Sequence, residues 1–230
     1  MMLDLAIITA RAGSVGLPGK NVAELGGVPL IAWTVRAAMA SRCFRRVIVS
    51  TDGPAIMSAA RAAGAEVPFV RPAELATSAA RSSDVVLHAL SATKTTGAFA
   101  LLQPTSPFRS AEHIRQAVRI YDGTPSPAVV SVGKGKPAAW QFTTDETGRL
   151  QPLARAVPSV SRRQDAEPLL APNGALYLCD VKTFRDQGTL FPDGVAGYVM
   201  GHIDSLDIDE EEDLALARAI VDARLRVIDS

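Results

Sequence analysis

Along residues 1–132, short β-branched runs alternate with longer alanine-rich stretches that carry apolar residues at helical spacing. The short runs predict buried strands at residues 5–9, 46–51, 67–70, 99–103 and 128–132. The longer stretches predict helices at residues 30–40, 54–64, 82–92 and 111–121. Strands that alternate with helices form right-handed βαβ units and a mainly parallel sheet. We therefore predict an α/β, Rossmann-like fold with helices on both faces of the sheet.

The pattern changes at residues 133–172, where apolar runs become short and prolines recur. A structureless loop of this length is unusual inside a compact domain. We therefore predict a single domain, residues 1–230, in which residues 133–172 form an insertion that packs against a second copy of the chain. Strand patterns resume at residues 175–178 and 198–201, and residues 210–224 predict a closing amphipathic helix.

Composition and charge narrow the class of protein. The chain has 230 residues with 24 basic and 24 acidic side chains, so a global positive charge for nucleic acid or membrane binding is absent. The two cysteines, Cys43 and Cys179, are too few and too far apart for a disulfide framework or a structural metal site. No apolar stretch is long enough to cross a bilayer, and no leader pattern precedes the first strand. We expect a cytoplasmic protein.

The stretch ARAGSVGLPGKN, residues 10–21, follows the first predicted strand. Ligands of open parallel sheets bind beyond the carboxyl ends of the strands. Gly13 and Gly16 let backbone N–H groups approach an anion, and Arg11 and Lys20 supply balancing charge. The stretch matches neither GxGxxG nor a P-loop. Taken alone, it is equally compatible with an ordinary turn that carries solvated bases.

Asp207 and Asp209 lie between a predicted strand and the last helix. Residues two apart in an extended segment point to the same side, so both carboxylates can reach one hard cation such as Mg²⁺. The alternative is helix capping, with Asp209 as the N-cap. Capping accounts for the glutamates that follow but not for the alignment of the two aspartates.

Polar residues also occur at other strand ends and helix starts. Gln103 begins QPTSPFR after a predicted strand, where a side-chain amide can orient a ligand. Arg71 follows the strand predicted at residues 67–70, and Ser82 begins a helix. Residues 172–174, Pro-Asn-Gly, form a turn signal. The three histidines share no obvious neighbourhood, so we assign them no acid–base role.

Taken together, six stretches spread over residues 6–217 resemble the acylneuraminate cytidylyltransferases, the CMP-sialic acid synthetases. They are ARAGSVGLPGKN, SRCFRRVIVSTDG, VPFVRPAELA, LLQPTSPFR, PNGALY and DSLDIDEEEDL. The resemblance implies a sugar nucleotidyltransferase fold, dimerisation through the insertion, and activation of sialic acid or a related 2-ulosonic acid with CTP. The related ketodeoxyoctulosonate branch fits less well at the first stretch.

The resemblance also implies roles for individual residues. Those that hold the triphosphate and ribose are Arg11, Ser14, Lys20 and Asn21, together with the loop glycine Gly13. Those that contact the rest of the nucleotide are Arg71 and Ser82. Those that line the sugar pocket are Gln103, Arg163, Tyr177 and Phe191, with Arg163 supplied by the partner subunit in one arrangement. The magnesium ligands are Asp207 and Asp209. The residues that act on the reacting phosphates are Arg11, Lys20 and Asp209.

Two departures from the family pattern keep other functions open. Val15 stands where the family commonly has lysine, and Ala171 stands where it often has arginine. One alternative is a cytidylyltransferase for another anionic acceptor, such as an aminoalkylphosphonate. A further alternative is a nucleotide-binding homologue with weakened catalysis.

Overall fold

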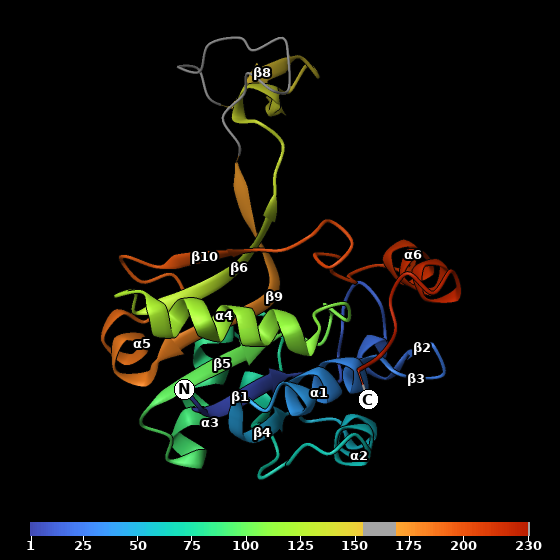
Figure 1. Ribbon diagram of the computed structural model, residues 1–230. Helices are drawn as coiled ribbons and strands as arrows, with labels where there is room; N and C mark the ends of the chain where they lie inside the picture. Colours follow the sequence, from blue (N-terminus) through green and yellow to red (C-terminus); the bar gives the residue numbers. More distant parts are fainter. Residues whose placement is uncertain (154–168, 230) are drawn as a thin grey trace.

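The computed structural model describes residues 1–153 and 169–229, and within these ranges a six-stranded sheet forms the centre of the molecule (Figure 1). Its strand order is β10-β6-β9-β5-β1-β4. The strands are β1 (Leu3–Thr9), β4 (Phe44–Ser50), β5 (Ala98–Leu102), β6 (Ala128–Lys134), β9 (Leu170–Asp180) and β10 (Ala196–Val199). Only β9 runs antiparallel to its neighbours among these six. The prediction of a mainly parallel sheet is confirmed.

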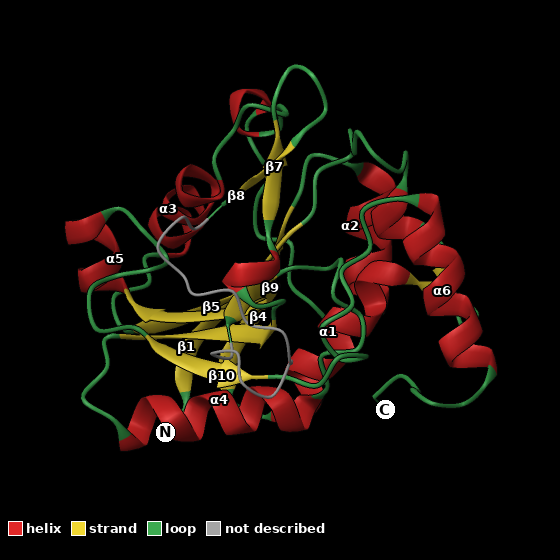
Figure 2. Ribbon diagram, turned by 90° about the horizontal axis from the view of Figure 1, so that it is seen from above, coloured by secondary structure: helices red, strands yellow, loops and turns green. Residues whose placement is uncertain are grey.

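Helices cover both faces of this sheet, as the alternation of side chains along β1 requires. Ala6 and Ile8 belong to the core under α1 (Leu30–Ser41), α2 (Pro54–Ala62) and α4 (Ala111–Gly123). Leu5 and Ile7 belong to the core under α3 (Ser82–Thr93) and α5 (Val181–Gln187). Figure 2 shows the sheet between α4 on one side and α3 on the other.

A third core anchors the last helix, α6 (Glu211–Asp222). Leu214 and Ala217 of α6 belong to one buried cluster with Trp33, Phe108 and Ile208. Next to α6 lies the short hairpin of β2 (Glu24–Leu25) and β3 (Val28–Pro29). Because Ile208 is buried in this cluster, the aspartates on either side of it have fixed positions.

The segment predicted as an insertion contains regular structure. β6 and β9 continue to pair beyond the body of the protein, up to Lys134 opposite Leu170. They carry a separate exposed hairpin of β7 (Phe142–Thr144) and β8 (Leu150–Pro152), preceded by the 3₁₀ turn η3 (Ala138–Trp140). Figure 1 shows this arm projecting from the sheet. The irregular sequence pattern therefore reflects a two-stranded arm with solvent on most sides.

Two local predictions differ from the structure, and one helix was not predicted. Residues 67–70 are not a strand: only Glu66 forms a bridge, to Ile48, because Pro68 lacks the N–H that a ladder needs. Pro172, Asn173 and Gly174 lie inside β9 rather than in a separate turn. The helix α5 was not predicted. Among the described helices, none has the length and apolar character needed to cross a membrane.

Candidate active site

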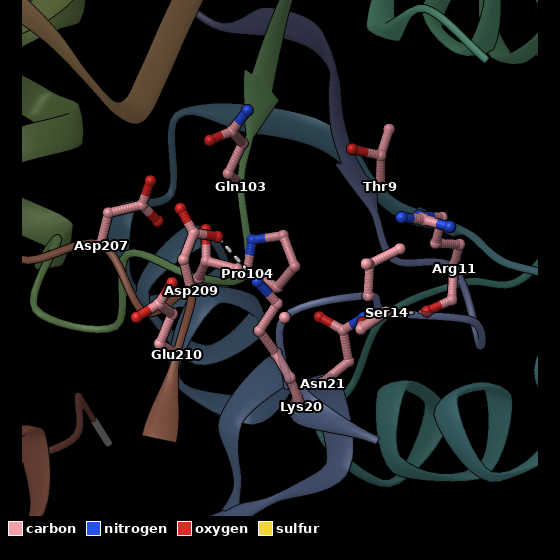
Figure 3. Close-up of a pocket in the computed structure, with 13 residues that line it drawn as sticks. Thr9, Arg11, Ser14, Lys20, Asn21, Gln103, Pro104, Asp207, Asp209 and Glu210 are labelled. Carbon is pink, nitrogen blue, oxygen red and sulfur yellow. Dashed lines mark hydrogen bonds and ion pairs between the residues drawn. The ribbon is translucent and has the colours of Figure 1, made fainter. Parts of the chain in front are cut away.

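A cavity of about 530 Å³ lies at the carboxyl ends of β1 and β5, and we call it the first cavity. Three predicted loops supply its walls, and Figure 3 shows the acidic side chains opposite Arg11, with Lys20 between them. Its lining residues are Thr9, Arg11, Ser14, Val15, Gly16, Lys20, Asn21, Gln103, Pro104, Thr105, Asp207, Asp209 and Glu210. Arg11 and Lys20 of the first loop therefore share one cavity with the aspartate pair, although Lys20 and Asp209 are 189 residues apart in sequence.

Lys20 connects the two charged walls. It begins the 3₁₀ turn η1 (Lys20–Val22), and its Nζ donates to Asp209 Oδ1 at 2.8 Å and to the Ile208 carbonyl at 3.0 Å. The Lys20 side chain is 12% exposed, whereas that of Asp209 is 70% exposed. Asp209 is not the N-cap of α6, because Glu210 is, and Asp213 accepts from the N–H groups of both residues. The Asp209 carboxylate therefore remains available to a ligand.

Asp207 occupies a more buried position in the same cavity. The Ile208 N–H donates to the Thr105 carbonyl at 2.8 Å, which joins the aspartate segment to the loop that follows β5. Burial raises the pKa of Asp207 above its ordinary value, and its Oδ1 has no hydrogen-bond partner among the described residues. An unpaired buried carboxylate oxygen is costly. This atom is therefore suited to receive a cation or a donor group from a ligand.

The glycines of the first loop have different structural roles. A Cβ atom on Gly16 would lie 2.6 Å from the Asp209 carbonyl oxygen, so this glycine permits the close contact between the two walls. Gly13 does not line the first cavity, and a Cβ atom there would meet only Arg11 Nη1 at 4.0 Å. The structure thus gives Gly16 a contact with protein backbone in addition to the predicted approach to an anion.

Two further contacts hold the first loop in place. The Ala12 N–H donates to Asp52 Oδ1 at 2.9 Å, which links the loop to the STDG segment after β4. Asn21 Nδ2 donates to the Arg11 carbonyl at 3.1 Å. Asn21 was expected to contact a ligand, and in the structure its side chain also holds the backbone of the first loop. Asp52 was not predicted as a site residue, although its position after a strand end was a usable signal.

Arg71 and Ser82 line a smaller cavity of about 160 Å³, together with Thr9 and Arg11. Thr9 and Arg11 also line the first cavity, so the two cavities adjoin. Arg71 donates to the Ser50 carbonyl and, at 3.2 Å, to Ser50 Oγ. Burial lowers the pKa of Arg71 to about 10, which leaves it charged at neutral pH. The structure therefore brings both residues next to the first loop.

A larger cavity of about 750 Å³ lies beside the first, and we call it the second cavity. Gln103 and Asp207 line both cavities and form their junction. Its other lining residues are Gly133, Lys134, Ala171, Pro172, Asn173, Gly174, Tyr177, His202, Ile203, Ser205, Leu206, Leu216 and Ile220. Most of this wall is apolar. α6 could not be predicted as part of this wall, because Leu216 and Ile220 have only the spacing of an amphipathic helix.

The start of β9 shapes the second cavity. Gly174 has φ +77°, and a Cβ atom there would lie 2.4 Å from Gln103 Oε1. Asn173 is buried, accepts from Ser131 Oγ at 2.6 Å and donates to Ser205 Oγ at 3.0 Å. These bonds accompany a register shift between Val130 and Val132 of β6. The Pro-Asn-Gly segment is thus a bulge beside Gln103.

The remaining predicted residues have different outcomes. Tyr177 lines the second cavity. Phe191 does not line it, but its ring packs edge-on against that of Tyr177 with centroids 5.8 Å apart. Arg163 lies outside the residues that the structure describes. His202, to which no role was assigned, lines the second cavity.

Comparison with known structures agrees with this architecture. A CMP:2-keto-3-deoxy-manno-octonic acid synthetase complexed with CTP superposes with a TM-score of 0.71, covering 96% of this chain and 99% of that one. The sequence identity is 16%, so this likeness concerns the fold alone. The fold is that of the nucleotidyltransferases.

Sequence comparisons define the family. The cytidylyltransferase family model matches residues 5–173. The N-acylneuraminate cytidylyltransferase of Escherichia coli O18:K1:H7 is 38% identical over 94% of this chain, which spans 51% of that protein. The CMP-N,N'-diacetyllegionaminic acid synthase of Legionella pneumophila is 36% identical over 96% of this chain and 97% of its own length. The chain therefore belongs to the cytidylyltransferase family.

Proposed function

We propose that the protein transfers CMP from CTP to a 2-ulosonic acid, such as sialic acid or a related nonulosonate. The observation that carries the proposal is the junction of two cavities at Gln103 and Asp207, one lined by bases and carboxylates and the other mostly apolar. In the reaction, the anomeric hydroxyl oxygen loses its proton and forms a bond to the α-phosphorus of CTP, while the bond to pyrophosphate breaks. Two adjoining cavities can hold the two substrates in line for this step.

The first cavity is proposed to hold the triphosphate and ribose. The lining residues assigned to this role are Arg11, Ser14, Lys20 and Asn21, with Arg71 and Ser82 contacting the rest of the nucleotide in the adjoining small cavity. Gly13 is assigned to the triphosphate from the loop sequence, although it lies outside the cavity lining. Arg11 and Lys20 would stabilise the charge that develops on the α-phosphate and on pyrophosphate. Lys20 Nζ already has a fixed position between Asp209 Oδ1 and the Ile208 carbonyl, so little reorganisation is needed.

Asp207 and Asp209 are proposed to hold a magnesium ion. The fit rests on hard oxygen donors that line one cavity and on the unpartnered buried Oδ1 of Asp207. No group of three or more His, Cys, Asp or Glu gathers as a metal site in the described ranges, which suits an ion that keeps waters and substrate phosphates as further ligands. Magnesium, when bound, neutralises negative charge on phosphate oxygens.

The second cavity is proposed to hold the acid. Gln103 at the junction would orient the sugar near the α-phosphate, and Tyr177 would contact its substituents. Phe191 would act through its packing on Tyr177. Arg163 is assigned to the sugar from the family resemblance, with the partner subunit as one source.

We also propose that the protein is a homodimer in the cytoplasm. The arm carries the exposed apolar side chains Phe142, Leu150, Leu153 and Leu170, which a second copy would cover. Cys43 and Cys179 are free and buried, as suits a reducing compartment.

Sedimentation equilibrium tests the dimer: Phe142→Ser combined with Leu150→Ser should shift the protein towards monomer. A parent protein that is monomeric at all concentrations would refute it.

The activity test uses CTP, Mg²⁺ and a panel of acidic acceptors, with pyrophosphate release as the rate and mass spectrometry of the CMP product as identification. We expect a CMP-ulosonate product from the parent protein and almost none from Asp209→Asn. The surface variant Asp186→Asn is the matched control and should keep full activity. A folded parent protein that releases no pyrophosphate with any ulosonic acid would refute the proposal, and product from an aminoalkylphosphonate alone would reassign the acceptor.

A further inference from the structure

Arg109 is one of the largest buried side chains in the described part of the chain, with an exposed fraction of 1%. It belongs to the QPTSPFR stretch, but it lines neither the first nor the second cavity. Burial lowers the pKa of its guanidinium to about 9, so it stays charged at neutral pH. A buried charge is expensive and needs a compensating function or partner. The nearby negative charge of Asp229 offsets part of this cost.

The hydrogen bonds of Arg109 lie where two strands stop pairing. The register of β5 and β9 ends with Leu101 opposite Tyr177. Gln103, directly after β5, and Ala175 of β9 each lie two residues beyond this last pair. Arg109 Nη1 donates to both of their carbonyls, to Gln103 at 3.1 Å and to Ala175 at 2.8 Å. Two carbonyl groups cannot bond to each other, so a donor from elsewhere is needed to connect them. One guanidinium nitrogen thus replaces the missing part of the ladder.

The two residues that Arg109 connects are at the junction of the cavities. Gln103 lines both cavities, and Ala175 directly follows Gly174, whose backbone lies against the Gln103 side chain. Thr34 Oγ1 also donates to the Gln103 carbonyl, but at the longer distance of 3.4 Å. The Ser106 N–H also donates to this carbonyl, at 3.5 Å, so Arg109 makes the shortest of the three bonds that the Gln103 carbonyl accepts among the described residues.

We propose that Arg109 is a positioning residue that holds Gln103 and the β9 bulge together, and so sets the shape of the acceptor subsite without touching a substrate. Its kinetic test rests on the proposed function, whereas its structural test does not. Arg109 Nη1 carries two N–H groups in the guanidinium plane, one for each carbonyl, whereas the lysine ammonium is a compact donor on a stem of different reach. Arg109→Lys therefore keeps the charge and disturbs the bridge.

The first test compares Michaelis constants. We expect Arg109→Lys to raise the KM for the acid about 10-fold or more, while the KM for CTP changes less than about 3-fold. The surface variant Arg115→Lys should change neither. In a Gln103→Ala background, Arg109→Lys should add less than about 2-fold, because residues that act through one another are not additive. Full additivity, or an equal rise in both KM values, would overturn the proposal.

The second test is amide hydrogen exchange, which does not depend on turnover. Arg109→Lys should speed exchange at Ala175 and Ser106 about 10-fold or more and leave the amides of β1 unchanged. A uniform increase across the sheet would mean general destabilisation and would overturn the positioning role. If the parent protein turns over no acid, the proposed function fails and this exchange pattern alone decides the role of Arg109. If Arg109→Lys does not fold, the uncharged variant Arg109→Gln, which also removes the bond to the Ala175 carbonyl, is expected to give the same local pattern, and unchanged exchange at Ala175 and Ser106 would refute the proposal.

Discussion

The two cavities of the site differ in how they are built. The first is formed by three loops that each follow a strand, and its walls are joined by charge and by backbone contacts such as the pair Lys20 and Asp209. The second is formed by a bulged antiparallel strand, a loop and the apolar side of α6. A polar cavity tolerates little change in charge, whereas an apolar wall is sensitive to volume and polarity. We therefore expect changes in the first cavity to affect catalysis and the binding of CTP, and changes in the second cavity to affect the binding of the acid.

The largest effect is expected from Lys20→Met. This variant removes the charge between the two walls and leaves Asp209 without its partner. We expect kcat to fall by about 10²–10³-fold, the magnitude for loss of one preorganised donor. Pyrophosphate release at saturating substrates measures it. Lys182→Met, which removes a lysine that is paired with Asp186 on the surface, is the control. A fall of less than about 3-fold would mean that Lys20 does not act on the phosphates.

Gly174→Ala tests the junction between the cavities. Both this variant and its control, Gly188→Ala, place alanine at positive φ, +77° and +66°, which costs about 1 kcal/mol. Only Gly174 faces a neighbour that a Cβ atom would strike, Gln103 Oε1 at 2.4 Å. Gln103 Oε1 is the end of a flexible side chain that can move aside, so we expect an additional loss of only about 1 kcal/mol from overpacking, and a higher KM for the acid because Gln103 is displaced. Urea unfolding measures the loss of stability and steady-state kinetics measures the KM for the acid. Equal losses of stability in the two variants would contradict the expectation.

Leu216→Asn changes the wall of the second cavity alone. Leu216 is 53% exposed and lines this cavity, while Leu225 is 54% exposed and does not. We expect Leu216→Asn to raise the KM for the acid by about 3–10-fold, less than the roughly 10-fold or more for a methylene in an enclosed pocket because Leu216 is half exposed, and to leave the KM for CTP unchanged. Leu225→Asn should change neither constant. A change in the KM for CTP would show that the cavities are not independent.

Val15→Lys is expected to have the smallest effect. Val15 lines the first cavity and is 75% exposed, so a lysine can reach phosphate oxygens without a steric cost. An exposed ion pair is worth about 0.2–1 kcal/mol, which corresponds to about 1.4–5-fold tighter binding of CTP or pyrophosphate. Isothermal titration at low and high salt measures it, and the gain should shrink as salt screens the charge. An unchanged affinity at low salt would argue against this placement of the side chain.

A comparison of individual strands and helices shows which of them could be predicted from the sequence pattern. The strands β1, β4, β5 and β6 were predicted because each is a short apolar run, rich in β-branched residues in β1, β4 and β6 and made of Ala, Phe and Leu in β5. The direction of β9 could not be predicted, since a buried strand shows the same apolar run whether it is parallel or antiparallel. The strand predicted at residues 67–70 was wrong, because the apolar residues there suggest a strand but Pro68 has no N–H to donate to a ladder. The short helix α5 was too brief to show a clear period.

The sequence by itself determined the α/β order of elements, the loops at the strand ends and the residue types that suit phosphate and a hard cation. Spacing along the chain is enough for these features, because they depend on neighbours within one loop or one helix. Tertiary structure alone decided that Lys20 contacts Asp209, that Gly174 lies against Gln103, and that Arg109 joins β5 to β9. Each of these contacts depends on the register and order of strands that are far apart in sequence, and this information is absent from any local pattern.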